Sequence, residues 1–66
     1  MTAKQVSILV KAALNAGYGI THAPDRRIGY TTNFYIVSAP GGHHLNTYQT
    51  EIQAKRFLAA VYRKAA

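Results

Sequence analysis

A chain of 66 residues is near the lower limit for folding around one hydrophobic core without disulfide bonds or a metal, so it can hold only one domain. So small a core leaves little apolar surface to line a substrate pocket, which argues against an enzyme, and the absence of cysteine excludes disulfides and thiolate metal sites. Eight Lys and Arg residues against two acidic residues give a net charge of +6, and polyanions are the natural partners of such a chain.

The sequence predicts a soluble protein of the cytoplasm. A reducing compartment suits a chain without cysteine. No stretch approaches the roughly 18 consecutive apolar residues of a membrane span, and polar residues interrupt the apolar run that a signal peptide would need. We therefore expect no membrane partner.

The first predicted element is a helix over about residues 3–16. Apolar side chains recur on one side of it at about 100° per residue: Val6, Leu9, Val10 and Ala13. Thr2 and Gln5 have the spacing of a capping box, and Gly17 is placed to end the helix in the left-handed conformation. Ile8 falls on the polar side, so we expect it to cover a sheet edge or to join an exposed contact patch.

Three strands are predicted next, at residues 18–23, 32–39 and 43–48, because β-branched and aromatic residues alternate there with turn residues. The segment 23–26 is expected to be a turn and the segment 39–42 a tight hairpin connection. Within the second strand, the alternation assigns either Phe34 and Ile36 or Tyr35 and Val37 to the core. The sequence leaves both assignments open.

A second helix is predicted over about residues 50–64. Thr50 and Gln53 repeat the capping-box spacing, and Glu51 in the first turn suits the positive end of the helix dipole. Its apolar face holds Ala54, Phe57, Leu58, Val61 and Ala65. The predicted fold is therefore a single α+β domain over residues 1–66: a small antiparallel three-stranded sheet flanked by an N-terminal and a C-terminal helix, in the order αβββα.

Basic side chains occur in three separate segments, and we expect folding to gather them on a shared side. Such groups bind phosphates strongly and release counterions, which makes nucleic acid the first expected partner. The residues expected to contact it are Arg26, Arg27, His43, His44, Asn46, Lys55, Arg56, Arg63 and Lys64. Tyr30 and Tyr35 are the aromatic pair expected to be exposed and able to stack on bases.

Other chemistry has little support in the sequence. Asp25 and Glu51 are the only carboxylates and each suits a local role, in a turn and at a helix start, so no catalytic residue is predicted. His43 and His44 are neighbours on a strand and point to opposite faces, which argues against one shared metal. We expect them to be surface residues able to donate to phosphate when protonated. Neither a metal nor a cofactor is expected.

Residues 33 to about 61 are predicted to form a strand, the Pro40-Gly41-Gly42 turn, a second strand and a helix. This order resembles the arm-type DNA-binding domain of tyrosine recombinases, in which one helix backs a three-stranded sheet whose exposed face enters the major groove. The resemblance covers less than half of the chain. It implies DNA contacts by outward side chains around Arg26, Arg27, Tyr35, His43 and Asn46. Strands 32–39 and 43–48 lack the Arg and Lys of that family, which moves the expected contact surface toward the Arg26-Arg27 loop and the last helix.

The alternative to nucleic acid is a protein partner, with the chain acting as a compact inhibitor or regulator such as a phage-encoded anti-CRISPR-like protein. Its signature would be an exposed apolar patch on the helices that includes Ile8, Tyr18 or Ile52. A homodimer is compatible with either function, because short edge strands and a small core are often completed by a symmetric partner.

Overall fold

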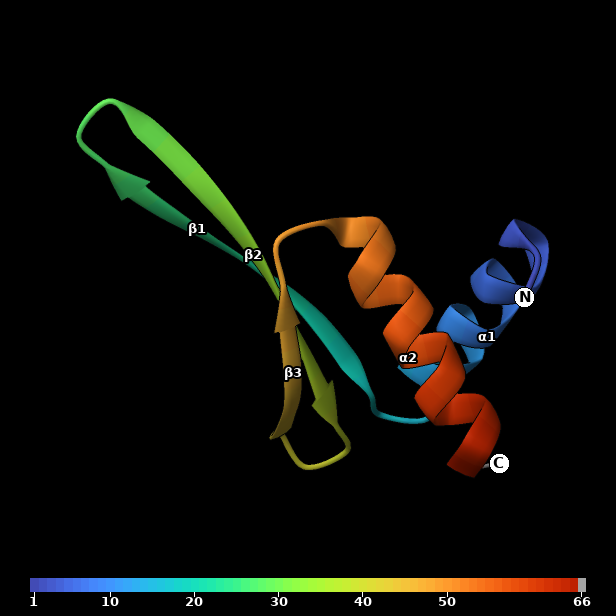
Figure 1. The fold of residues 1–66 in the computed structure, drawn as a ribbon. Coiled ribbons are helices and arrows are strands. Elements are labelled where there is room, and N and C mark those ends of the chain that lie inside the picture. Colours follow the sequence, from blue (N-terminus) through green and yellow to red (C-terminus); the bar gives the residue numbers. More distant parts are fainter. Residues whose placement is uncertain (66) are drawn as a thin grey trace.

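The sheet consists of three antiparallel strands in the order β1-β2-β3, and both helices lie on the same face of it (Figure 1). This computed structural model describes residues 1–65. The elements in chain order are α1 (Ala3–Asn15), β1 (Gly19–Arg27), β2 (Tyr30–Ala39), β3 (His43–Tyr48) and α2 (Glu51–Ala65). The predicted αβββα order and the α+β class are therefore confirmed.

Local signals in the sequence determine where the helices begin and end. The Thr2 hydroxyl accepts from the Gln5 amide at 3.2 Å, and the Gln5 side chain accepts from the Thr2 amide at 3.0 Å, so the predicted capping box is confirmed. Gly17 follows the C-cap residue Ala16 and takes a positive φ of 104°, as predicted, and Tyr18 N donates to Ala13 O at 3.0 Å. At the start of α2, the Thr50 hydroxyl accepts from the Gln53 amide at 3.3 Å.

The first hairpin differs from the prediction. A turn at residues 23–26 is wrong, because β1 continues through Pro24 to Arg27 and the chain reverses at Ile28 and Gly29. Pro24 is compatible with a strand here because β1 lies at the edge of the sheet, where a missing N–H donor need not interrupt a ladder. Gly29 has a φ of 88°, which side-chain-bearing residues rarely adopt, and this explains where the turn forms.

The packing of the helices decides which face of β2 is buried. Val37 is completely buried beneath them and Tyr35 is half-buried on the same face. Phe34 and Ile36 lie on the opposite face, which no helix covers, and remain half-exposed. Of the two assignments that the alternation allows, the one with Tyr35 and Val37 toward the core is therefore correct.

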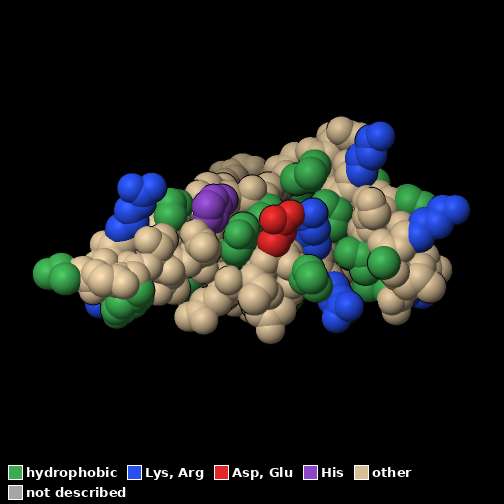
Figure 2. All heavy atoms as spheres, turned by 90° about the horizontal axis from the view of Figure 1, so that it is seen from above, with side chains coloured by type: hydrophobic (Ala, Val, Ile, Leu, Met, Phe, Trp, Pro, Cys, Tyr) green, Lys and Arg blue, Asp and Glu red, His purple; other side chains and the backbone are tan. Residues whose placement is uncertain are grey.

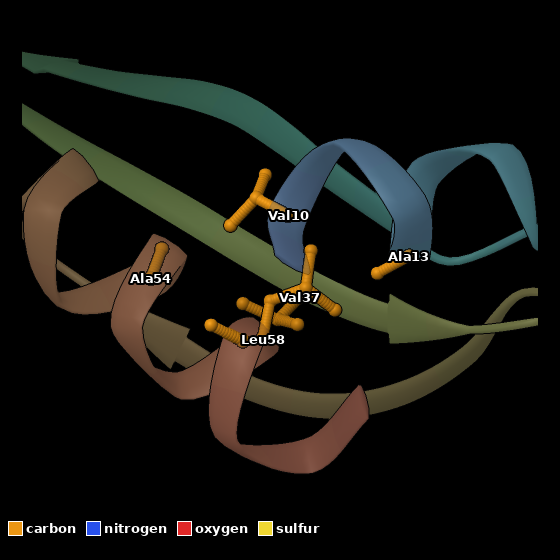
Figure 3. Packing of buried hydrophobic residues seen from close by; sticks show 6 residues of the cluster. Val10, Ala13, Val37, Ala54 and Leu58 are labelled. Atoms are coloured by element: carbon orange, nitrogen blue, oxygen red, sulfur yellow. The ribbon is translucent and has the colours of Figure 1, made fainter. Parts of the chain in front are cut away.

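The core is small and half of its buried residues are alanines. Its members are Val10, Ala13, Val37, Ala54, Leu58 and Ala59, which gather around Val37 (Figure 3). Small side chains allow α1 and α2 to approach each other closely, while α2 also packs against β2 and β3. Within the predicted apolar face of α2, Ala54 and Leu58 are buried, whereas Ala65 is exposed at the end of the helix and does not join the core.

No helix within residues 1–65 combines the length and the apolar character that crossing a membrane requires.

Candidate nucleic-acid interface

The β1–β2 hairpin extends well beyond the rest of the sheet. Strand β3 pairs with β2 only between Tyr35 and Ala39. The five pairs from Ala23↔Phe34 to Arg27↔Tyr30 are therefore bonded only to each other. At about 3.4 Å per residue they form a ribbon about 17 Å long. We name residues 23–34 the projecting hairpin, and Figure 1 shows it reaching away from both helices and from β3.

Two arginines lie at the end of the projecting hairpin, on opposite faces of it. Arg26 pairs with Thr31 on the face that carries the helices, and Arg27 pairs with Tyr30 on the open face. Arg27 Nε donates to Asp25 Oδ2 at 3.2 Å, so this guanidinium is partly neutralised. Arg26 has no ion-pair partner among residues 1–65. The hairpin thus presents one cation on each side of a narrow two-stranded ribbon.

Four of the predicted contact residues lie on α2, and they differ in how they are engaged. Lys55 Nζ contacts Glu51 Oε1 at 2.7 Å, one helical turn earlier. The hydrogen bond and the positive charge of Lys55 lower the pKa of Glu51 below its usual value of 4.5. Arg56 and Arg63 are seven residues apart, so they lie on one stripe of the helix, and Lys64 lies about 100° further round.

The predicted contact residues of β3 are largely engaged within their own strand. His44 Nε2 hydrogen-bonds Thr47 Oγ1 at 2.8 Å, and Asn46 Nδ2 donates to the Tyr48 hydroxyl at 3.2 Å. His43 and His44 pair with Ala39 and Ser38, which places them on opposite faces as expected. Within residues 1–65, no three His, Asp or Glu side chains come together where they could hold a metal ion.

The structure does not gather these basic groups into one continuous patch. The turn of the projecting hairpin and the C-terminal end of α2 lie at opposite ends of a molecule whose longest dimension is 42 Å (Figure 1). Figure 2 shows Lys and Arg side chains set apart along one face, with acidic and histidine side chains between them. Local clusters, rather than one continuous basic surface, are therefore the units that could contact a polyanion.

Of the two tyrosines expected to be exposed, Tyr30 and Tyr35, only one is. Tyr30 is 62% exposed beside the turn, in agreement with the prediction. Tyr35 is half-buried, because its ring stacks on His22 at a centroid distance of 5.0 Å. His22 Nε2 in turn hydrogen-bonds Asn33 Oδ1 at 2.9 Å, so these side chains brace the base of the projecting hairpin. Tyr30 alone is therefore available for stacking.

One conspicuous residue was missed by the sequence reasoning. Ile28 occupies the turn of the projecting hairpin and is completely exposed, at 101% of its reference area. It was overlooked because the turn was expected at residues 23–26. The signal that could have found it is Gly29, since a glycine between two alternating segments is typical of a tight connection.

A second surface, on the outer side of the two helices, combines exposed apolar side chains with the basic side chains of Lys55, Arg56 and Arg63. Ile8 and Ile52, expected in such a patch, are 59% and 65% exposed, and Met1 beside them is 54% exposed. Met1 lines two adjoining shallow grooves, one of about 300 Å³ with Ile8 and one of about 200 Å³ with Ile52. Tyr18, the third residue expected there, is half-buried and makes an edge contact with Tyr62 at 5.8 Å.

The resemblance to arm-type domains of tyrosine recombinases stays a prediction. The chain matches no protein-family model, no curated protein and no solved structure.

Proposed function

We propose that this chain binds double-stranded nucleic acid by placing the projecting hairpin in a groove of the duplex. DNA is the first candidate. The observation that carries the proposal is the pair Arg26 and Arg27, one on each face of a free two-stranded ribbon. A two-stranded antiparallel ribbon is one of the elements that can enter a DNA groove, whether major or minor.

The geometry of a groove explains why one arginine on each face is useful. Both walls of a groove are phosphate backbones, so a ribbon between them meets negative charge on either side. Arg26 can contact one wall while Arg27 contacts the other, because neighbouring strand residues point in opposite directions. A ribbon about 17 Å long also exceeds the groove depth of about 8 Å, so the helices can remain outside.

Polar side chains on the same ribbon support contacts with base edges or sugars. Thr31, Thr32 and Asn33 lie on β2 within the projecting hairpin, and alternation distributes them over both faces. Asp25 is the only acidic residue there, and its charge is taken up by Arg27. The net charge of the chain adds a long-range attraction that increases the rate of encounter with a polyanion.

The proposal is tested by measuring how the affinity for a short labelled duplex depends on salt, between about 50 mM and about 200 mM. Each lost phosphate contact lowers the slope of log affinity against log salt by about 0.9. The double variant Arg26→Ala/Arg27→Ala should therefore lose about two units of slope. The double variant Arg56→Ala/Arg63→Ala is the matched control, because it removes the same charge from α2.

Two outcomes would contradict the proposal. An equal loss of slope in both double variants would mean that net charge, and not the projecting hairpin, holds the duplex. No detectable binding of the wild-type chain to mixed-sequence duplex at low salt would reject a nucleic-acid function.

A second candidate function is the binding of a protein partner through the outer side of the helices. The exposure of Met1, Ile8 and Ile52 next to two shallow grooves favours it, because exposed apolar patches often mark interfaces. A stoichiometric protein partner that survives nuclease treatment and is lost in Ile8→Glu would support this function. Sedimentation at several concentrations would show whether that partner is a second copy of the chain.

A further inference from the structure

We infer that Ile28 is a wedge that inserts between adjacent base pairs and bends the duplex. The inference rests on the proposed binding of duplex nucleic acid and adds what the tip of the projecting hairpin does there. Ile28 is the most exposed large apolar side chain within residues 1–65, and none of these residues covers it. Proteins that kink DNA commonly insert an apolar side chain of this kind, isoleucine among them, between two base pairs.

The residues around Ile28 suit such a role. Arg26 and Arg27 precede it, so phosphates on both sides of an opened step have a cation within reach. Tyr30 follows at 62% exposure and lies on the same face as Arg27, where its ring could stack on a base that the wedge displaces. The segment 26–30 thus holds the two cations, the apolar wedge, the turn glycine and the aromatic ring in five consecutive residues.

The shape of the turn keeps the tip narrow. Only two residues, Ile28 and Gly29, connect the paired residues Arg27 and Tyr30. Gly29 supplies the positive φ of 88° and has no neighbouring atom within 4 Å of the position that a Cβ would occupy. The tip therefore presents a single large side chain, held at the end of a ribbon whose base is braced by the His22–Tyr35 stack.

The effect of a wedge on the duplex can be measured separately from binding. Opening a base step costs least where the pairing is already weakened, so the wild-type chain should bind a duplex with a central mismatch more tightly than its matched counterpart. A duplex labelled at both ends with a fluorescent donor and acceptor should show the ends approaching when the chain binds. Both effects should be greatest at flexible pyrimidine–purine steps.

The critical variant is Ile28→Ala, with Ile28→Leu as its matched control. Ile28→Ala should weaken binding by about 10- to 100-fold, the loss expected when a buried isoleucine side chain is shortened to a methyl group. It should also remove most of the mismatch preference and the approach of the duplex ends. Ile28→Leu should keep both, because leucine is an equally effective wedge. Since Ile28 touches no core residue, circular dichroism of all three chains should be the same.

The outcomes distinguish this inference from the function on which it rests. Salt-dependent binding without bending, or with a mismatch preference that Ile28→Ala retains, would overturn the wedge and leave duplex binding standing. Absence of binding to any duplex would overturn both. If Ile28→Ala instead abolished binding to vesicles containing anionic lipid and left duplex binding unchanged, the tip would be a membrane contact and the wedge would be rejected.

Discussion

The substitution Leu58→Ala should remove a large part of the stability of this fold. Leu58 and Val37 are the largest completely buried side chains, and three of the remaining core residues are alanines. Leu58 lies where α2 meets both the sheet and α1, so the cavity left by the substitution cannot be filled by a single shift. Shortening a buried leucine to alanine costs about 2–5 kcal/mol through lost transfer energy and the cavity that remains.

This loss is large compared with the free energy of unfolding of the whole chain. At about 0.05–0.15 kcal/mol per residue, a chain of this length has a free energy of unfolding of about 3–10 kcal/mol. The measurement is urea unfolding followed by far-ultraviolet circular dichroism, where the slope for a small protein is about 1 kcal/mol per molar urea. Leu58→Ala should therefore lower the midpoint by about 2 M or more, or abolish the folded baseline altogether.

Ile52→Ala is the control, because it shortens a similar side chain on the same helix at a position that is 65% exposed. Its free energy of unfolding should stay within about 0.5 kcal/mol of wild type. Equal losses in the two variants would refute the reasoning, because the core would then not centre on Leu58. A large loss in Ile52→Ala that shrinks on dilution would show that the outer surface of the helices is buried in an assembly.

Three further predictions concern charge and backbone geometry. Asp25→Asn should raise the affinity for duplex DNA a few-fold at low salt, an effect of about 0.5–1 kcal/mol. The substitution removes a charge that repels phosphate and frees Arg27 from its ion pair. Weaker binding of the variant in a titration would contradict this prediction. Gly17→Ala should lower the free energy of unfolding by about 1–2 kcal/mol. The reason is that φ is 104° at this position and the new Cβ would lie 3.3 Å from Pro40 Cβ. An unchanged melting temperature would contradict this prediction. Because Lys55 lowers the pKa of Glu51, the stabilisation by this pair should be present above pH 4.5 and disappear as the pH falls through the lowered pKa. Glu51→Gln should therefore unfold at lower urea than wild type near neutral pH, and a difference that persists unchanged in strong acid would exclude the ion pair as its cause.

Elements whose signals lie within a few residues of sequence were predictable. The capping box of Thr2 and Gln5, the stop at Gly17 and the strand at 43–48 depend on neighbours along the chain, and all three occur as expected. Arg26 and Arg27 were chosen as contact residues from sequence alone, because the excess of basic residues is visible without a fold, and their contact role stays a prediction.

Features that depend on contacts between distant segments needed the tertiary structure. The alternation of β2 is the same for either face, and only the seating of both helices on one side selects Val37 for the core. The neighbours of Pro24 in the sequence predict a turn. In the fold, Pro24 lies on the edge strand of the sheet, and β1 can therefore continue to Arg27. Because β3 ends opposite Tyr35, the end of the first hairpin stands free and Ile28 is exposed at its tip. Local sequence thus determined the order of the elements and the ends of the helices. The covering of one sheet face and the unequal lengths of the strands decided which side chains are buried and which reach solvent.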